Sequence, residues 1–466
     1  MKMKNICCIG AGYVGGPTMA VIALKCPNIN VKVVDVDIKK INAWNGPLNE
    51  LPVFEPGLKS VIDKTRNKNL FFSEKIDEAI EEAEMIFMAV NTPTKNEGPG
   101  AGMAADLKYI DSCTKRIAKT ALKDKIIIEK STLPVRTAER IKEILKKEGR
   151  KGVKFEVISN PEFLAEGTAI QDLFKSDRVL IGGDSTKSGQ EAVNKLMQIY
   201  LNWIPKEKIL TTNVWSSELT KLASNAMLAQ RISSINSLSA LCEKTGADID
   251  EVSMGIGMDH RIGSKFLKAS VGFGGSCFQK DILNLVYLCR HYGLEETAEY
   301  WHQVVKINDY QKKRFAKKIV SSLDGSLKDK KISILGWAFK KGTNDSRESP
   351  AIYISSFLLE KGATICVYDP MIGQAKIKRD LEEYYNKNDD LKDDFLSLLN
   401  KNLFAFDNVK KALLKADAIA IITEWDEFKN YDWGDIKENI SNNAIVFDGR
   451  NILSKKNGIN FFATGK

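Results

Sequence analysis

The sequence predicts an α/β protein in which two Rossmann-like α/β domains are joined by a long central helix and a helical domain. Three observations predict this fold class. Strand-like apolar runs alternate with amphipathic stretches as far as about residue 212. From Ser216 to Gly246, apolar residues then recur at three- and four-residue spacing with no Pro or Gly between, which is typical of one long helix. The order strand, glycine turn, helix and strand returns in the last third of the chain.

The first predicted domain covers residues 1–212. It begins with the strand NICCI, the turn GAGYVGG, a helix from about Pro17 to Leu24 and the strand VKVVDVD. Further strands are expected at residues 85–90, 125–131 and 155–160. Because strands that alternate with helices pair in parallel, we expect a parallel sheet with helices on both faces.

The other two predicted domains cover residues 213–323 and 324–466. In the central domain many small residues lie on the faces of the long helix, so we expect close packing, also against a second subunit. In the third domain, ISILGWAFK, SPAIYISSFLLEKG and ATICVYDP repeat the opening pattern of the chain. Only Gly336 remains of the fingerprint glycines, which predicts altered ligand use. Residues 385–396 are charged and predict an exposed insertion.

Composition and charge exclude several classes of protein. Of the 466 residues, 43% are hydrophobic and 28% are charged, as in a soluble globular protein. The net charge of +9 suits an anionic ligand, but solvated lysines are the simpler explanation, and no aromatic-rich basic motif indicates nucleic-acid binding. No apolar run reaches membrane-spanning length. Eight scattered cysteines and three histidines argue against disulfide and metal sites, so we expect a cytoplasmic chain with reduced thiols.

A glycine turn near the N-terminus predicts a dinucleotide site. Gly10, Gly12 and Gly15 form GxGxxG directly after a strand. The first allows a tight turn, the second lets the backbone approach a pyrophosphate, and the third lets the helix pack on the strand. The next strand ends in Asp35, whose carboxylate can bind both ribose hydroxyls and repel a 2′-phosphate. NAD is therefore the expected cofactor. Lys39 and Lys40 lie close by in the sequence, so NADP stays an alternative cofactor. The other alternative is a glycine turn with a purely structural role.

The stretch GFGGSCFQKD places a cysteine where a glycine-rich turn meets a predicted helix. If the helix begins near Ser276, Cys277 lies at its N-terminus, where backbone N–H groups and the helix dipole stabilise a thiolate. Asp281 follows four residues later and shares its face. We interpret Cys277 as a nucleophile and the other cysteines as small buried hydrophobes, which is also the alternative for Cys277.

Two further pairs carry polar groups at four-residue spacing. Lys221 and Asn225 lie on the long helix and can donate to a developing oxyanion, although in isolation a surface lysine and a helix asparagine are the simpler interpretation. In NPEFLAEG, Asn160 is expected to cap a helix that begins with a proline, so that Glu162 and Glu166 share a face at the carboxyl edge of the sheet. The alternative is a pair of first-turn carboxylates favoured by the helix dipole.

These residue types favour an oxidation in two steps. Hydride loss from an alcohol needs a base for the hydroxyl proton, yet the three histidines lie outside the glycine turns and NPEFLAEG. A cysteine suits a different task, because it can add to an aldehyde and give a thiohemiacetal. Loss of a second hydride gives a thioester, which water hydrolyses to an acid. This chemistry converts –CH2OH to –COO⁻ and consumes two NAD.

A set of motifs, in order along the chain, closely resembles the UDP-glucose 6-dehydrogenase family of nucleotide-sugar dehydrogenases. They run from about residue 4 to about residue 455 and are GAGYVGGPT, VVDVD, EPGL, VNTPT, STLPVRTAE, NPEFLAEGTAI, KLASNAMLAQRISSINSLSALCE, GFGGSCFQKD, GWAFKKGTNDSRESP, VYDP and FDGRN. The combination of GFGGSCFQKD with NPEFLAEG is shared only with related nucleotide-sugar dehydrogenases. The long runs in the middle favour the UDP-glucose members over those acting on GDP-mannose or UDP-N-acetylmannosamine.

The resemblance implies a role for each matching residue. The implied catalytic residues are Cys277 as nucleophile, Lys221 and Asn225 as oxyanion or proton-transfer groups, Asp281 and Thr132 as holders of the hydrolytic water, and Glu162 as an aid to proton transfer or hydrolysis. NAD would contact Gly10, Gly12, Tyr13, Val14, Gly15, Asp35, Lys40, Val90, Asn91, Thr92, Pro93, Thr94, Ser131, Thr132, Glu166 and Arg347. UDP-glucose would contact Glu162, Phe163, Leu164, Lys221, Asn225, Lys268, Phe273, Gly274, Lys340 and Arg450, with Arg261 reaching in from a neighbouring subunit.

The resemblance also implies the overall activity and its setting. The expected reaction is NAD-dependent oxidation of UDP-glucose to UDP-glucuronate, in a homo-oligomer whose dimers assemble into a hexamer and which UDP-xylose inhibits. Two alternatives stay open: a dehydrogenase of another nucleotide sugar, namely GDP-mannose or UDP-N-acetylmannosamine, and a non-catalytic NAD-binding scaffold. The complete catalytic set argues against the scaffold. No metal, nucleic acid or membrane partner is expected.

Overall fold

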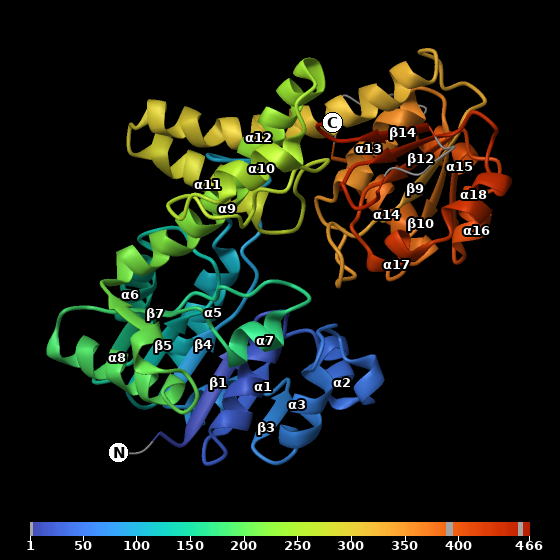
Figure 1. Cartoon of the computed structure of the whole chain (residues 1–466). Coiled ribbons are helices and arrows are strands. Elements are labelled where there is room, and N and C mark those ends of the chain that lie inside the picture. The colour runs from blue at the N-terminus through green and yellow to red at the C-terminus, as the bar shows by residue number, and fades with distance from the viewer. Residues whose placement is uncertain (1–2, 388–394, 455–459) are drawn as a thin grey trace. The chain divides into compact units, whose positions relative to one another are not determined.

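The computed structural model describes residues 3–387, 395–454 and 460–466, and these form two compact units. Unit 1 consists of Met1–Ser224 and Tyr287–Gly293, and unit 2 consists of Asn225–Val286 and Leu294–Lys466. In Figure 1 the sheet of unit 1 is coloured blue to green and the sheet of unit 2 orange to red. Of the insertion expected at 385–396, residues 388–394 lie outside the described residues.

Unit 1 is built on an eight-stranded sheet with the strand order β3-β2-β1-β4-β5-β6-β7-β8. The strands are β1 (Asn5–Ile9), β2 (Asn30–Val34), β3 (Leu70–Ser73), β4 (Met85–Met88), β5 (Lys125–Glu129), β6 (Phe155–Ser159), β7 (Val179–Gly182) and β8 (Ile209–Thr212). Strands β1 to β6 pair in parallel, which confirms the predicted parallel sheet. β7 and β8 are parallel to each other, but β7 pairs antiparallel with β6, which the sequence did not predict.

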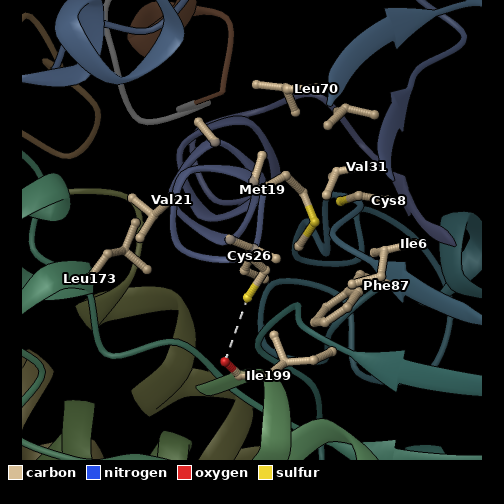
Figure 2. Packing of buried hydrophobic residues seen from close by; sticks show 14 of the residues in the cluster. Ile6, Cys8, Met19, Val21, Cys26, Val31, Leu70, Phe87, Leu173 and Ile199 are labelled. Atoms are coloured by element: carbon tan, nitrogen blue, oxygen red, sulfur yellow. Dashed lines mark hydrogen bonds between the residues drawn. The ribbon is translucent and has the colours of Figure 1, made fainter. Parts of the chain in front are cut away.

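Both faces of this sheet are buried. Along β1, Ile6 and Cys8 belong to one hydrophobic cluster and Cys7 and Ile9 to another, because successive side chains of a strand point to opposite faces. Figure 2 shows the first cluster, with Met19 beside Cys8. Helices α1 (Gly15–Lys25), α2 (Ile38–Asn45), α3 (Leu58–Thr65), α7 (Ala169–Phe174) and α8 (Lys187–Tyr200) contribute to the first cluster, and α4 (Ile76–Glu82), α5 (Lys108–Thr120) and α6 (Thr137–Glu148) to the second. Parallel sheets require such cover on both faces.

Unit 2 repeats this arrangement. Its parallel sheet has the order β11-β10-β9-β12-β13-β14, which corresponds to β3-β2-β1-β4-β5-β6 of unit 1. The strands are β9 (Lys331–Leu335), β10 (Thr364–Tyr368), β11 (Leu403–Phe406), β12 (Ala418–Ile421), β13 (Ile445–Asp448) and β14 (Asn460–Ala463). The helices are α13 (Pro350–Glu360), α14 (Gln374–Tyr385), α15 (Phe395–Asn402), α16 (Val409–Leu413), α17 (Asp426–Asn430) and α18 (Trp433–Asn439). The second Rossmann-like lobe predicted from the internal repeat is confirmed.

In sequence order, four helices follow β8 and precede β9: α9 (Val214–Thr245), α10 (Ile249–Gly257), α11 (Phe278–His291) and α12 (Glu295–Ser322). α9 is one helix of 32 residues, as the spacing of its apolar residues predicts. Its first part belongs to unit 1 and the rest to unit 2, so Lys221 and Asn225 belong to different units. The domain boundaries at residues 212 and 323 stay predictions. In the part of the chain that the structure describes, no helix combines the length and hydropathy that crossing a membrane requires.

A buried pair of acids at the end of β5 makes stability depend on pH. Burial and the charge of Glu218 raise the pKa of Glu129 well above its ordinary value, and burial raises the pKa of Glu218 to about 7. The folded protein therefore holds protons that the unfolded chain releases from about pH 4.5 upward, so these groups stabilise the fold below that pH and lose their effect as pH rises through 7.

Replacing Glu129 with Gln is expected to flatten this pH dependence. Glutamine cannot ionise, so the variant loses the contribution that the raised pKa of Glu129 makes to this pH dependence. The wild-type protein should lose on the order of 2 kcal/mol between pH 5 and 8 through this pair, and the variant should lose less. Thermal melting at half-unit pH steps measures the difference. If the melting temperatures of the two proteins changed with pH by the same amount, the assignment of the raised pKa to Glu129 would be contradicted.

Candidate active site

The turn between β1 and α1 is shaped by its glycines. Gly10 has a φ of +112°, and a β-carbon there would lie 2.3 Å from the carbonyl oxygen of Ala89, so a side chain does not fit. A β-carbon on Gly15 would lie 1.9 Å from the carbonyl oxygen of Gly10. A β-carbon on Gly12, by contrast, would meet no atom within 4 Å. The turn therefore leaves room at Gly12, beside the N-terminus of α1, and this fits the pyrophosphate of a dinucleotide.

Asp35 lies directly after β2, at the same edge of the sheet. Its Oδ2 accepts hydrogen bonds from the backbone of Ala11 and from Lys40 Nζ, both at 2.9 Å, and its Oδ1 accepts from the backbone of Asp37 at 3.0 Å. Burial alone would raise the pKa of Asp35, but these hydrogen bonds outweigh it and hold the pKa below its ordinary value. The carboxylate is thus ionised where a ribose is expected, and Lys40 pairs with it.

The segments that follow β4 and β5 are joined to each other. Ser131 Oγ donates to the carbonyl oxygen of Val90 at 2.6 Å, and Thr92 Oγ1 donates to the carbonyl oxygen of Thr132 at 3.0 Å. β4 and β5 are parallel neighbours, so both segments lie at the carboxyl edge that carries Gly10. Two stretches far apart in the sequence therefore line one edge, where doubly wound sheets bind ligands.

Three of the six predicted catalytic residues meet in unit 1. Lys221 Nζ lies 3.4 Å from Glu162 Oε1, and both side chains are less than a tenth exposed. Thr132 Oγ1 lies 3.5 Å from the same carboxylate oxygen. The Phe163 ring lies 5.5 Å from Lys221 Nζ and also stacks against Arg178 at 3.8 Å. The structure thus replaces the surface-lysine alternative for Lys221 with a buried ion pair.

The prediction that a helix begins in NPEFLAEG is wrong. Residues 160–165 are not helical, and α7 begins only at Ala169. Asn160 does not cap a helix, because its Nδ2 donates to the carbonyl oxygen of Leu180 at 2.8 Å and its Oδ1 accepts from Tyr200 at 2.7 Å. The segment is therefore not helical, and Glu162 and Glu166 do not share a helix face.

Cys277 lies at the start of α11, as the sequence predicts. The backbone N–H of Asp281 donates to the carbonyl oxygen of Cys277 at 2.9 Å, which is the first bond of the helix. Of the eight cysteines, Cys277 is exposed and the other seven are buried. The alternative that Cys277 is a small buried hydrophobe is therefore excluded. An exposed sulfur beside helix N–H groups suits a nucleophile.

Asp281 carries a buried carboxylate one helical turn after Cys277. It is 1% exposed, its Oδ2 accepts from Asn225 Nδ2 at 2.6 Å, and its Oδ1 accepts from Lys280 Nζ at 2.8 Å. Asn225 lies on α9 and reaches α11 through this bond. Two of the predicted catalytic side chains of unit 2 are thus fixed to each other, one turn from Cys277.

The glycines of GFGGSC have a packing role that the sequence did not reveal. A β-carbon on Gly274 would lie 2.4 Å from the carbonyl oxygen of Glu348, and a β-carbon on Gly275 would lie 3.0 Å from the Phe339 ring. The side chain of Asn308, on α12, holds the backbone of Phe273. It accepts a hydrogen bond from Phe273 N at 2.8 Å and donates one to Phe273 O at 3.0 Å. The loop that presents Cys277 is therefore rigidly packed within unit 2.

Replacing Gly274 with Ala is expected to destabilise the protein by about 1–3 kcal/mol, because the neighbouring atom is a backbone oxygen that cannot turn away. A lower urea midpoint measures this. Gly255 of α10 is the matched control, since a β-carbon there would meet no atom within 4 Å. Equal midpoints for Gly274→Ala and Gly255→Ala would contradict this packing.

The remaining predicted residues divide between the units. Unit 1 holds Tyr13, Val14, Asn91, Pro93, Thr94, Leu164 and Glu166, and unit 2 holds Arg261, Lys268, Lys340, Arg347 and Arg450. Within unit 2, Lys340 Nζ lies 5.6 Å from the Phe339 ring, and Arg450 donates to the carbonyl oxygen of Phe339 at 3.0 Å and lies 3.4 Å from Glu424. Arg347 and Arg261 are exposed and pair with Asp345 and Asp259, each at 2.6 Å.

Two residues that hold the site were not predicted from the sequence. Lys280 forms an ion pair with Asp281. This residue could have been recognised from the sequence, because it directly precedes Asp281 in GFGGSCFQKD. Asn308 gave no signal, since an asparagine within a long helix has no pattern of its own. Among the described residues, no group of three or more His, Cys, Asp or Glu side chains could hold a metal ion.

Comparison with known proteins places this geometry in context. Sequence profiles of three domains of the UDP-glucose/GDP-mannose dehydrogenase family match the chain: the NAD binding domain over residues 4–204, the central domain over residues 215–310 and the UDP binding domain over residues 333–455.

Characterised relatives cover nearly the whole chain. UDP-glucose 6-dehydrogenase 4 of Arabidopsis thaliana is 55% identical over 454 residues, which are 97% of this chain and 94% of that protein. UDP-glucose 6-dehydrogenase of Mus musculus is 56% identical over 453 residues, 97% of this chain and 90% of that protein. The solved structure of a UDP-glucose dehydrogenase from the archaeon Pyrobaculum islandicum has a TM-score of 0.82 at 29% identity and covers 98% of this chain and 97% of that one.

Proposed function

The chain belongs to the UDP-glucose/GDP-mannose dehydrogenase family, and we propose that it oxidises C6 of UDP-glucose to the carboxylate of UDP-glucuronate with NAD as the oxidant. The observation that carries the chemistry is the exposed Cys277 at the start of α11, next to the buried Asp281. The choice of UDP-glucose rests on the 55–56% identity to proteins named for that substrate.

The residues of unit 1 fit the cofactor. The open side of Gly12 and the N-terminus of α1 would hold the pyrophosphate, the ionised Asp35 would hold a ribose, and the segments around Thr92 and Ser131 would line the same edge. NAD, when bound, supplies the hydride acceptor for both oxidations. In unit 2, Arg347 is the residue proposed to contact it.

The first oxidation turns the C6 alcohol into an aldehyde. One hydride leaves C6 and one proton leaves the hydroxyl oxygen. The buried Lys221 and Glu162, 3.4 Å apart, form a pair that can take this proton and pass it on, with Thr132 on the same carboxylate. Asn225 and Lys221 would then donate to the aldehyde oxygen as charge develops on it.

The second oxidation takes place on Cys277. The thiolate adds to the aldehyde carbon and forms a C–S bond, and the oxygen takes up a proton, which gives a thiohemiacetal. Loss of a second hydride and the hydroxyl proton leaves a thioester. Water, positioned by Asp281 and Thr132, attacks the carbonyl carbon, the C–S bond breaks, and the carboxylate leaves with Cys277 restored. The sum is one UDP-glucose, two NAD and one water consumed.

Phosphate and sugar would be held mainly by cations of unit 2. Lys340, Arg450 and the exposed Lys268 would provide positive charge for the diphosphate. Phe273 and Gly274, in the loop packed by Asn308, are the contacts proposed for the hexose from unit 2. Phe163 and Leu164 are the contacts proposed from unit 1.

The proposal includes a homo-oligomer in the cytoplasm. Unit 2 exposes large apolar side chains that a second subunit would cover: Met227, Leu238, Leu241, Met254 and Met258. Arg261 would serve the neighbouring subunit, dimers would assemble into a hexamer, and UDP-xylose would act as feedback inhibitor. Sedimentation with and without UDP-xylose tests this assembly, and a monomer at micromolar concentration would rule it out. A reactive thiol also suits a reducing compartment.

One assay tests the function. The protein is mixed with NAD and limiting UDP-glucose, and the NADH formed per sugar is counted together with the product. We expect two NADH and one UDP-glucuronate. A ratio of one would remove the thioester step, and no NADH would favour a scaffold. GDP-mannose and UDP-N-acetylmannosamine in parallel reactions separate the sister activities, since faster turnover of either would overturn the choice of substrate.

A further inference from the structure

Lys130 is a buried lysine that none of the steps above uses. It directly follows β5 and is 3% exposed. Its Nζ donates to Asn160 Oδ1 at 3.3 Å. Long cationic side chains are rarely buried unless they are paired or functional.

Asn160 connects Lys130 to the proposed active site. Its backbone N–H donates to the carbonyl oxygen of Glu129 at 2.9 Å, and its side chain also binds Leu180 O and the Tyr200 hydroxyl. Glu162 follows two residues later in the same non-helical segment. Lys130 thus helps to fix the backbone from which the Glu162 carboxylate projects.

The charges around Lys130 are those of the proposed catalytic pair. Burial lowers the pKa of Lys130 to about 8, with the Glu162 carboxylate acting to raise it, the Lys221 ammonium to lower it further and the Cys8 thiol to raise it. The Tyr200 hydroxyl is the other titratable group on this network, and burial raises its pKa. Glu162 thus has Lys221 Nζ at 3.4 Å, and Lys130 is bonded to Asn160, two residues before Glu162 in the chain.

A second buried lysine shows what a structural lysine looks like in the same strand. Lys125 begins β5, is also 3% exposed, and donates to the carbonyl oxygens of Glu81 and Ala83. Burial lowers the pKa of Lys125 as well, but the charges acting on it are those of Lys123, Cys7, Glu84 and Glu81, none of them in the proposed site. Lys125 is thus a matched control for Lys130.

We propose that Lys130 is a positioning residue for the dehydrogenase reaction: through its bond to Asn160 it fixes the segment that carries Glu162, and its buried ammonium group adds a second positive charge that favours the Glu162 carboxylate. The proposal rests on the proposed function. It assigns Lys130 no contact with substrate or cofactor.

The activity test compares Lys130→Met with Lys125→Met. Loss of a nearby positive charge disfavours a carboxylate, so the acid limb of the pH profile of kcat/KM is expected to move up by about one pH unit in Lys130→Met. The two profiles should converge above pH 9, where Lys130 is neutral in the wild-type protein. Lys125→Met should keep the wild-type limb. Lys130→Arg, which keeps the charge, should restore it. Equal limbs in Lys130→Met and Lys125→Met would overturn the proposal.

A second measurement needs no activity and separates the two proposals. Urea midpoints are measured for Lys130→Met, Glu162→Gln and the double variant. At pH 7 the fall in urea midpoint of the double variant is expected to be smaller than the sum of the falls of the two single variants. At pH 10 it is expected to equal that sum. Additive losses at both pH values would refute the coupling between Lys130 and Glu162. If no nucleotide sugar is oxidised while the coupling is found, only the proposed function fails.

Discussion

Replacing Cys277 with Ala is expected to abolish formation of UDP-glucuronate. Without the sulfur the aldehyde has no covalent anchor, and the second hydride loss has no thiohemiacetal to act on. A fall in kcat of roughly 10⁴-fold or more is expected, as for other covalent nucleophiles. NAD binding should stay close to that of the wild-type protein, because Gly10, Gly12 and Asp35 lie in unit 1 and Cys277 in unit 2. Product analysis by chromatography and NAD titration by fluorescence measure the two results.

Cys289 provides the matched control for this variant. It lies on the same helix, α11, but is buried, and burial raises its pKa. Cys289→Ala should therefore form the acid at close to the wild-type rate. Normal acid formation by Cys277→Ala would show that the nucleophile is misassigned.

Replacing Asp281 with Asn should block the reaction after the covalent step. The carboxylate is 1% exposed and accepts from Asn225 and Lys280, so its loss leaves the Lys280 ammonium without its anionic acceptor and deprives the hydrolytic water of a base. We expect a rapid burst of about two NADH per subunit, the amount that two hydride losses on one substrate require. Steady turnover should then be about 10³-fold slower than in the wild-type protein.

The burst distinguishes this effect from a loss of folding. Stopped-flow absorbance of NADH measures the burst, and thermal melting reports whether the variant is folded. Lys280→Met, which removes the other member of the ion pair, is expected to keep part of the steady turnover, because the carboxylate remains. An Asp281→Asn protein that is folded, shows no burst and turns over at the wild-type rate would rule out the assigned role.

Much of this fold could be predicted from sequence periodicity. The parallel sheets, the 32-residue α9 and the repeat of one strand order in both units follow from apolar runs of strand length, uninterrupted helical spacing and a returning glycine turn. The antiparallel pairing of β6 with β7 could not be predicted, because strand direction depends on how the chain crosses the sheet and leaves no local pattern.

The candidate site was predicted less evenly. Cys277 could be recognised because a glycine turn followed by a helix has a local signature. The helix expected after Asn160 fails because the bonds of that side chain to Leu180 and Tyr200 come from residues distant in sequence. Tertiary partners of this kind override a capping pattern. The packing of Gly274 on Glu348 was hidden for the same reason.

The bond between Cys277 and C6 of the sugar is most directly tested by acid quenching. Wild-type protein and Asp281→Asn are mixed with NAD and UDP-glucose and quenched with acid within milliseconds. The proteins are then digested, and the mass of the peptide that contains Cys277 is measured by mass spectrometry. We expect a UDP-glucuronyl adduct on that peptide, abundant in Asp281→Asn, scarce in the wild-type protein and released by hydroxylamine as a thioester would be. An unmodified Cys277 peptide in both proteins while NADH is being formed would contradict it.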